Sequence, residues 1–290
     1  MNEATDTTRD FIVRTMNADE VNLAIEWAAR EGWNPGLYDA HCFRSADPDG
    51  FFIGELRGEP VGCISAIAYG GQFSGQFGFI GLYIVRPEFR GKGLGLRIWR
   101  HGIAYLGKRN IGLDGVVAQQ PNYRKSGFQL AHRNIRFQGI AEAGVTASAL
   151  TDVRQLPFDK LALYDGRFFP APREAFLRAW IEQPETVALA NVVDGQIRGY
   201  AVLRRCREGR KIGPLFADDA QTAEALFTAL AARCAGETVA LDVPELNTAA
   251  IALAERHGMA SVFETARMYT KHAPDIPLAR LYGVTSFELG

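Results

Sequence analysis

The sequence predicts an α/β or α+β protein built from two domains of similar design. The chain has 290 residues, of which 47% are hydrophobic, and this is more than one small domain needs. Segments with strand and helix periodicity alternate along both halves. Landmark residues also recur at nearly constant offsets of 137, 132, 128 and 131 positions: Gly62, Gly81, Asp114 and Gly127 correspond to Gly199, Gly213, Asp242 and Gly258. A repeat of this length indicates a duplicated domain rather than a solenoid.

The first half begins with a strand and a capped helix. Asn17 and Glu20 have the spacing of a capping box, and apolar residues then recur at helical spacing to about residue 30. The segment 32–36 contains two glycines and a proline, which end that helix. A further helical segment is predicted over 38–44 and a longer helix over 92–108. Strands are predicted over 11–15, 51–56, 61–69, 77–85 and 111–118, with a Gly-rich turn over 70–75 and one more strand beginning or ending at 137–139.

The second half repeats this order after a small, polar segment, 141–156, which we interpret as a linker. Asp194 and Gly195 fit the turn of a β-hairpin. The predicted domains are therefore 10–140 and 157–290. Strands are predicted over 186–193, 197–206, 211–216, 239–243, 262–269 and 282–289, and helices over 220–234 and 248–257.

Composition excludes several classes of protein. The 32 basic and 33 acidic residues nearly balance, so no nucleic-acid partner is expected. The polar residues 1–9 lack the apolar core of a secretory signal, and no apolar stretch is long enough to span a membrane. The histidines show no ligand spacing, so no metal is expected. The cysteines are scattered without a C-x-x-C pair, which favours reduced thiols in the cytoplasm; they are Cys42, Cys63, Cys206 and Cys234.

The strongest chemical motif lies between the strand 77–85 and the helix that follows it. Residues 90–95 read Arg-Gly-Lys-Gly-Leu-Gly, and the glycines allow a sharp turn close to a ligand. The first turn of a helix offers unpaired N–H groups and a positive dipole end, and Arg90 and Lys92 add charge. This arrangement predicts a pyrophosphate site. The glycine spacing fits neither a P-loop nor the dinucleotide fingerprint.

These residues resemble the motif of the GNAT acetyltransferase superfamily, R/Q-x-x-G-x-G/A after a strand ending V-x-P. Arg90, Gly93 and Gly95 match the loop, and residues 83–87 match the strand end. The resemblance implies that acetyl-CoA is the co-substrate, with the pyrophosphate on the loop amides and the pantetheine arm along the strand backbone. The cofactor-binding residues expected from it are Ile84, Val85, Arg90, Gly91, Lys92, Gly93, Leu94, Gly95, Leu96, Asn122 and Ser126.

A second match to the family occurs at residues 122–128, which resemble its Y-x-x-x-G-F element. Tyr123 stands four residues before Gly127, where the family often has a tyrosine that acts as general acid. Packing of this tyrosine on the sheet is the competing interpretation. The resemblance also implies a mixed, mostly antiparallel central sheet flanked by helices in each half.

The second half resembles a degenerate copy of this domain, as in bacterial tandem proteins of the family. Residues 216–221, at the position of the loop, contain no glycine and two acids, which would repel a pyrophosphate. Ala254 stands where Tyr123 would be echoed. We therefore expect one CoA and one active site in each chain.

The general base and the acceptor site are less determined. The strand 77–85 contains no acid, so the glutamate that some GNAT enzymes carry there is absent. Asp114, Glu31 and His41 are the candidate bases, and water is an alternative. A buried structural role competes for Asp114, because its counterpart Asp242 lies in the half without the loop. The residues expected to contact the acceptor are Trp33, Tyr38 and Tyr83.

The leading functional hypothesis is acetyl transfer from acetyl-CoA to a primary amine of a small molecule, by direct attack in a ternary complex. One alternative is a non-catalytic module that senses acyl-CoA or binds a partner. Another is a transferase with a longer acyl-CoA or a different donor, although the loop and the near-neutral charge disfavour aminoacyl-tRNA. A monomer or a homodimer is expected.

Overall fold

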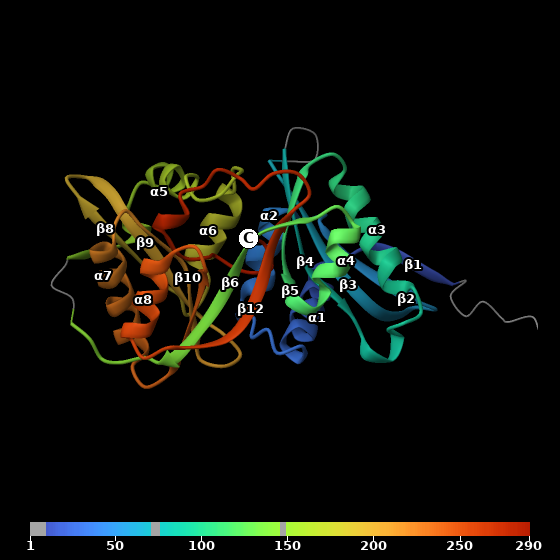
Figure 1. The fold of residues 1–290 in the computed structure, drawn as a ribbon, viewed down its shortest axis with the longest axis horizontal. Coiled ribbons are helices and arrows are strands. Elements are labelled where there is room, and N and C mark those ends of the chain that lie inside the picture. Colours follow the sequence, from blue (N-terminus) through green and yellow to red (C-terminus); the bar gives the residue numbers. More distant parts are fainter. Residues whose placement is uncertain (1–9, 71–75, 146–148) are drawn as a thin grey trace, which may run out of the picture.

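The structure is a computed structural model that describes residues 10–70, 76–145 and 149–290. Most of the Gly-rich turn predicted over 70–75 lies outside these residues. Two groups of helices and strands lie on either side of two long central strands (Figure 1). The two halves of the sequence form these two groups, and the strands of both groups join in one sheet.

The described residues of the first half form four α-helices and six strands. The capping box of α1 is confirmed, because the side chain of Asn17 accepts a hydrogen bond from the amide of Glu20 and the Glu20 carboxylate accepts one from the amide of Asn17. The elements are β1 (Phe11–Thr15), α1 (Ala18–Arg30), α2 (Asp39–Ala46), β2 (Phe51–Leu56), β3 (Glu59–Tyr69), β4 (Phe77–Val85), α3 (Leu94–Leu106), β5 (Asn110–Val116), α4 (Gln120–Lys125) and β6 (Gln129–Ile140).

The second half follows the same order with three departures from the prediction. Two short helices, α5 and α6, precede its hairpin, and β7 lies inside the segment 141–156 that was predicted as a linker. The predicted last strand, 282–289, is wrong beyond residue 283. The elements are β7 (Leu150–Asp152), α5 (Phe158–Asp165), α6 (Glu174–Glu182), β8 (Val187–Val193), β9 (Gln196–Arg205), β10 (Arg210–Ala217), α7 (Ala220–Ala231), β11 (Thr238–Pro244), α8 (Thr248–Arg256), β12 (Ala260–Tyr269) and β13 (Leu281–Gly283).

All strands belong to one sheet, in the order β1-β2-β3-β4-β5-β12-β6-β11-β10-β9-β8-β7, with β13 paired to β10. In the described ranges, only β4 with β5 and β10 with β11 pair in parallel, and every other pair is antiparallel. The predicted mixed, mostly antiparallel sheet flanked by helices is thus confirmed.

The two halves exchange strands: the last long strand of each half pairs with a strand of the other half. β12, from the second half, pairs with β5, and β6, from the first half, pairs with β11. β6 and β12 also pair with each other along most of their length, at the centre of the molecule (Figure 1). The predicted domain bounds, 10–140 and 157–290, separate the two halves of the sequence. They do not separate the sheet, because β6 and β12 each pair with a strand of the other half.

The exchanged strands carry a matched pair of buried ion pairs. Arg267 on β12 lies opposite Asp114 on β5, and Arg136 on β6 lies opposite Asp242 on β11. The distances between guanidinium and carboxylate atoms are 2.5 and 2.6 Å, and these side chains are almost wholly buried. The sequence analysis predicted that Asp114 and Asp242 are counterparts. Their equal pairing supports a structural role for both.

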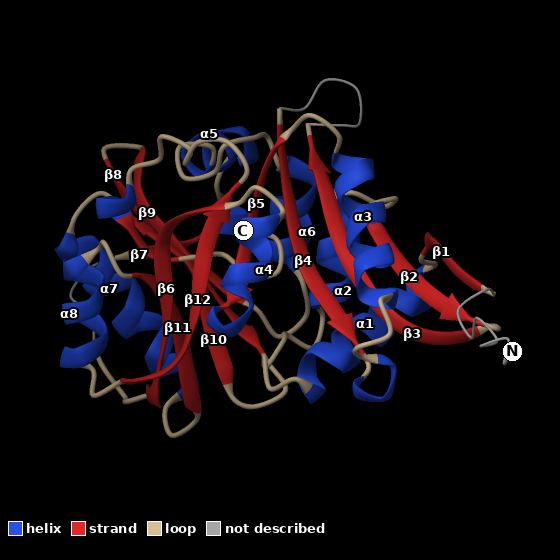
Figure 2. Ribbon diagram, turned by 45° about the vertical axis from the view of Figure 1, so that its right-hand side comes forward, coloured by secondary structure: helices blue, strands red, loops and turns tan. Residues whose placement is uncertain are grey.

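The helices pack in layers on the two faces of the sheet (Figure 2). α1, α2, α5 and α6 contribute to one hydrophobic cluster that continues from one half into the other. Phe43 of α2 stacks on Trp180 of α6 with ring centroids 6.1 Å apart. α3 packs on the opposite face of the first half, and α7 and α8 on the opposite face of the second. The cluster between the halves fixes their relative position, and with it the walls of the pocket described next.

Candidate active site

A pocket opens where strands β4 and β5 separate. Their parallel pairing runs from Phe77 opposite Asn110 to Ile80 opposite Leu113, and both strands then continue without further pairing to each other. The cavity between them has a volume of about 310 Å³. Its lining includes residues 80–85 of β4, residues 113–116 of β5, and residues of both halves of the chain.

The pocket wall formed by β4 contains a β-bulge. Cys63 pairs with Ile84 and Ser65 with Gly81, so β4 has one more residue than β3 in this interval. Leu82, within the bulge, has φ +46°, a left-handed conformation that is strained for a leucine. Such bulges interrupt a ladder and redirect backbone groups. The interruption lies on the stretch that lines the pocket.

The predicted pyrophosphate loop follows β4 after one short 3-10 turn, Pro87–Phe89. Gly91 and Gly93 have φ +74° and +76°, and a methyl group on either would meet no atom within 4 Å. Gly93 is the N-cap of α3, and no side chain caps this helix. The first-turn N–H groups therefore remain available to an anion. Lys92, Leu96 and the two glycines are exposed, whereas Leu94 is buried under the helix.

The side chain of Arg90 connects the loop at residues 90–95 to the pocket. Its Nε donates a hydrogen bond to the carbonyl oxygen of Val85 at 2.7 Å, and its guanidinium lies 2.5 Å from the carboxylate of Glu31. Arg90 and Glu31 both line the pocket. Glu31 is thus brought to the site, but as the ion-pair partner of Arg90.

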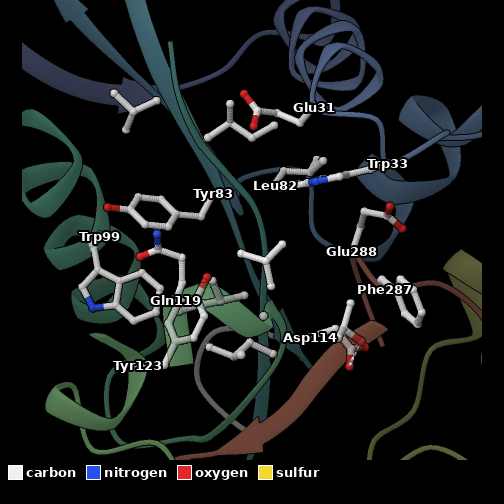
Figure 3. Close-up of a pocket in the computed structure, with 18 of the residues that line it drawn as sticks. Glu31, Trp33, Leu82, Tyr83, Trp99, Asp114, Gln119, Tyr123, Phe287 and Glu288 are labelled. Atoms are coloured by element: carbon white, nitrogen blue, oxygen red, sulfur yellow. Dashed lines mark hydrogen bonds between the residues drawn. The ribbon is translucent and has the colours of Figure 1, made fainter. Parts of the chain in front are cut away.

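Three aromatic rings form one side of the pocket (Figure 3). Trp99 of α3 lies between Tyr83 and Tyr123, with ring centroids 5.3 and 5.6 Å away. The Tyr123 ring packs on Gly115 so closely that a side chain at position 115 would overlap it. Burial, and then the neighbouring Tyr83, raise the pKa of Tyr123 to about 12. Its hydroxyl therefore keeps its proton at neutral pH.

Asn122 and Ser126 lie on the exposed side of α4 and at its end. The Asn122 amide donates to Gln119 Oε1 at 2.7 Å, and the Ser126 hydroxyl donates to the Asn122 carbonyl at 3.4 Å. Neither lines the pocket, whereas Gln119, which the sequence analysis did not single out, does. Gln119 follows the end of β5 and precedes α4, a position that no motif marks.

The opposite side of the pocket comes from the second half and from Trp33. Phe263 and Thr265 of β12 contribute to it, as do Phe287 and Glu288 near the end of the chain. Figure 3 shows Trp33, Phe287 and Glu288 on this side and the three aromatic rings on the other. The exchanged strand β12 and the segment that follows β13 together bring the second half to the pocket.

Arg136 packs against this wall of the pocket. Besides its pair with Asp242, it donates a hydrogen bond to the carbonyl oxygen of Trp33 at 2.8 Å. Its guanidinium also lies 4.9 Å from the ring centroid of Phe287 and 5.8 Å from that of Phe263. One buried cation therefore touches three residues of the wall.

Two residues predicted for the site lie elsewhere. His41 is exposed on α2, where it lines a separate depression with Asn22 and Arg44. Tyr38 donates a hydrogen bond from its hydroxyl to Glu185 Oε1 at 2.9 Å and does not line the pocket. Both follow the Gly-Trp-Asn-Pro-Gly turn in sequence, but the chain leaves the pocket after Trp33.

Asp114 lines the pocket but is heavily engaged. Its carboxylate accepts hydrogen bonds from Arg267 at 2.5 and 2.9 Å and from the Asn134 amide at 2.8 Å, and its side chain has no exposed surface. Donors of the protein itself therefore already occupy the oxygens of this carboxylate. The structural interpretation of Asp114 therefore has the better support.

Glu288 was missed by the sequence analysis. It lines the pocket, its exposed fraction is 3%, and its Oε2 has no hydrogen-bond partner in the described structure. It is far from the loop in sequence, and no motif contains it. The sequence predicted a strand over 282–289, so Glu288 was expected in the sheet rather than in this pocket.

The corresponding split in the second half is filled by the chain itself. β10 and β11 pair from Arg210 to Ile212, and beyond that point β13 pairs with β10 while the amide of Val284 donates to the Asp242 carbonyl of β11 at 2.8 Å. Gly213, the counterpart of Gly81, faces the carbonyl oxygens of Val284 and Thr285. The second half thus has no open equivalent of the pocket at this place.

Comparisons with known proteins agree on the family. Residues 19–128 match the model of the acetyltransferase (GNAT) family, and residues 161–283 match a model described as an acetyltransferase (GNAT) domain. The chain is 32% identical over 275 residues to the holothin acyltransferase of Pseudoalteromonas sp. (strain SANK 73390), covering 94% of this chain and 92% of that protein.

Solved structures show the same fold. A proposed acetyltransferase from Pyrococcus horikoshii superposes with a TM-score of 0.83 at 21% identity, covering 97% of this chain and 96% of that one. A tandem GNAT protein from the clavulanic acid biosynthesis pathway superposes with a TM-score of 0.60 at 14% identity, covering 91% and 99%. The second of these shares the arrangement of two GNAT domains in one chain.

The described residues offer neither a membrane-spanning helix nor a metal cluster. None of their helices has the length and apolarity needed to cross a bilayer. No group of three or more His, Cys, Asp or Glu side chains in that part of the chain has the geometry to hold a metal ion.

Proposed function

Because this chain belongs to the GNAT family of acyltransferases, we propose that it transfers an acetyl group from acetyl-CoA to a primary amine of a small molecule. The observation that carries the proposal is the open split between β4 and β5, with an uncapped helix N-terminus at one end and a pocket in the middle. An extended thioester fits such a split, and its pyrophosphate fits the helix end.

The residues of the loop suit the donor. Backbone amides from Gly91 to Leu96 would hold the pyrophosphate, with Arg90 and Lys92 adding positive charge. The backbone of Ile84 and Val85, on the pocket side of β4, would accompany the pantetheine arm. Asn122 and Ser126 remain proposed contacts at the exposed end of α4.

The chemistry follows from the two sides of the pocket. The acceptor enters beside Trp33 and Phe287, and its nitrogen attacks the thioester carbon directly, forming a C–N bond. A backbone amide near the β4 bulge would donate to the oxyanion. The C–S bond then breaks, and Tyr123 gives its proton to the leaving thiolate.

We propose one donor site in each chain. In the second half, residues 281–284 already lie between β10 and β11, in the place that the donor would take. The second half would instead serve the acceptor, because Phe263, Thr265 and Phe287 line the pocket.

A small acceptor is favoured by the size of the cavity, about 310 Å³, and by its walls from both halves. A relative that is 32% identical over 275 residues is named holothin acyltransferase. That name specifies an acyl group, so the length of the acyl chain should be tested rather than assumed.

The first experiment measures thiol release from acetyl-CoA with a panel of amino acids, polyamines, amino sugars and aromatic amines. Release that requires an acceptor, with the N-acetyl product seen by mass spectrometry, is expected. Propionyl-CoA and hexanoyl-CoA, run in parallel, define the acyl chain. Tight binding of CoA with no product from any amine would favour the sensing alternative.

The second experiment tests the loop with a matched pair of variants. Gly93→Glu places a carboxylate where the pyrophosphate should bind, and Gly258→Glu places one at a left-handed glycine of similar φ, +66° against +76°, far from the loop. We expect calorimetry to show loss of CoA binding for Gly93→Glu alone. Equal binding by both variants would contradict the loop assignment.

The four cysteines are unpaired and buried, and we propose a cytoplasmic location on that ground. The prediction of a monomer or homodimer stays a prediction.

A further inference from the structure

We infer that Glu288, from the C-terminal segment, takes the proton from the acceptor ammonium before the amine attacks. The inference rests on the proposed function and adds to it the missing general base. It also names the acceptor class, since a base is needed only for an amine that is protonated at neutral pH.

The backbone of Glu288 is fixed at the pocket by Gly81. A methyl group at position 81 would lie 2.8 Å from the carbonyl carbon of Glu288 and nearer still to its oxygen. Gly81 itself lines the pocket on β4, one residue before the bulge. The strand without an acid of its own therefore has a glycine that admits an acid from elsewhere in the chain.

The residues next to Glu288 are held firmly. The hydroxyl of Tyr69 donates to the carbonyl oxygen of Leu289 at 2.9 Å, and the amide of Leu289 donates to Ser286 Oγ at 3.1 Å. Leu289 has no exposed surface, and Phe287 is 7% exposed. A carboxylate on so constrained a segment has a defined position, which a catalytic base needs.

Glu288 differs from the other pocket carboxylates in its partners. Among the described residues that line the pocket, three carry a carboxylate: Glu31 is bound by Arg90, Asp114 is bound by Arg267, and Glu288 keeps a buried oxygen without a hydrogen bond. A buried polar atom without a partner is costly, so it commonly marks a place where a ligand binds. An ammonium group would supply the missing donor.

The charged groups around Glu288 are Arg136 of β6 and Arg204 of β9, together with Glu31 and Asp114 on the pocket wall. Glu288 is one cause of the raised pKa of both arginines. Each arginine has its own carboxylate partner, Asp242 for Arg136 and Asp39 for Arg204. A role in balancing these arginines is the competing explanation for Glu288.

The position of Glu288 suits the direction of the reaction. It lies with Trp33 and Phe287, across the pocket from Tyr83, Trp99 and Tyr123 (Figure 3). The acceptor would thus lose its proton on one side, while the thiolate would gain one on the other.

The protons balance over the whole reaction. The ammonium N–H bond breaks and its proton passes to the Glu288 carboxylate, which later releases it to water. The neutral nitrogen forms the C–N bond, and the C–S bond breaks. The thiolate gains the Tyr123 proton, and the second proton of the nitrogen restores the tyrosine. The sum is an amide, free CoA thiol and one proton.

The test uses Glu288→Gln, with Glu255→Gln as a matched control on the exposed surface of α8. Each enzyme is assayed with an alkylamine, which is charged at pH 7.5, and with an arylamine of related shape, which is not. We expect Glu288→Gln to lower kcat/KM for the alkylamine about 100-fold at pH 7.5. The loss should shrink as pH rises toward 10, and the loss for the uncharged amine should stay under about 5-fold.

Equal losses for both amines at every pH, or no loss for either, would overturn the inference and leave a structural role. Glu288→Asp keeps the base, so it should recover part of the alkylamine rate; failure to do so with a wild-type unfolding midpoint would also count against it. The proposed function is judged separately, by wild-type turnover and by CoA binding, which should be the same in all four proteins.

Discussion

The backbone carbonyl of Glu288 occupies the space that a side chain on Gly81 would need, although 207 positions separate the two residues. Both backbones are held in place, because Gly81 is paired with Ser65 of β3 in the sheet and Glu288 is in a buried segment. Their contact ties the end of the second half to the reaction site of the first.

The Gly81→Ala variant should therefore be less stable than the wild type and should catalyse acetyl transfer more slowly. Overpacking typically costs about 1–3 kcal/mol, which a shift in the denaturant midpoint would show. We expect acetyl transfer to fall while CoA binding persists, because the loop is not disturbed. Gly166→Ala is the control, since that glycine has φ −60° and a methyl group there would come no nearer than 3.3 Å to the Ala162 carbonyl oxygen, a much milder contact than at Gly81. A Gly81→Ala protein with unchanged midpoint and rate would contradict the packing argument.

Tyr123→Phe should lower kcat about 100-fold and leave the dissociation constant for CoA nearly unchanged. The hydroxyl is needed only when the thiolate leaves. Because burial raises the pKa of Tyr123 to about 12, loss of its proton should cause no decline of kcat between pH 7 and 10. Tyr38→Phe, outside the pocket, should retain full kcat. Undiminished turnover by Tyr123→Phe would remove it as the general acid.

Arg136→Gln should cost about 3–5 kcal/mol of unfolding free energy, because Asp242 would remain as an unpaired buried charge. The acceptor KM should rise as well, since Arg136 also contacts Trp33 and Phe287. Arg133→Gln is the matched control on the same strand. Its pair with Glu264 is 42% exposed on both sides, so about 0–1 kcal/mol is expected. Similar losses from both variants would refute the distinction.

His132 should make the protein less stable in acid. Burial, and then Arg267, lower the pKa of His132 to about 4 from 6.5. Below pH 6.5 the unfolded chain binds this proton and the folded chain does not, so the free energy of unfolding falls as pH drops toward 4. The loss reaches about 3 kcal/mol for this group. His132→Asn should flatten that part of the stability curve measured by urea unfolding; an identical curve would exclude His132 as the cause.

Residues 1–145 alone should not form a stable domain. Without the second half, β5 loses its neighbour β12, and β6 loses both β12 and β11. Exposed strand edges of this kind favour aggregation. Co-expression with residues 146–290 should restore a soluble complex with acceptor-dependent activity. A monomeric, cooperatively folded 1–145 fragment would show that strand exchange is dispensable.

Local patterns predicted the parts of the fold that are themselves local. The capping box of Asn17 and Glu20 depends on residues three positions apart, and the loop after β4 depends on glycines at alternate positions of one short segment. The offset between Asp114 and Asp242 also correctly indicated equivalent places in the two halves. Helix α5 was missed because its eight residues are too few to show a clear helical periodicity.

Contacts between distant segments could not be predicted in this way. The alternation of strands and helices does not show which neighbours a strand will pair with. The exchange of β6 and β12 could therefore not be predicted from it. Glu31 and Asp114 were chosen as candidate bases by type and position, but their ion pairs with Arg90 and Arg267 depend on the folded chain. Glu288 was missed for the same reason, since only the fold brings it to Gly81.

The exchange of β12 has a consequence for how the protein can diversify. The three aromatic residues on one side of the pocket are encoded between Tyr83 and Tyr123, whereas most of the opposite wall is encoded between Phe263 and Glu288. Mutations in the later stretch of the gene can reshape one wall of the pocket while the loop at residues 90–95 is inherited unchanged. The half whose own strand split is filled by residues 281–284 is thereby the part of the chain in which new pocket shapes can arise.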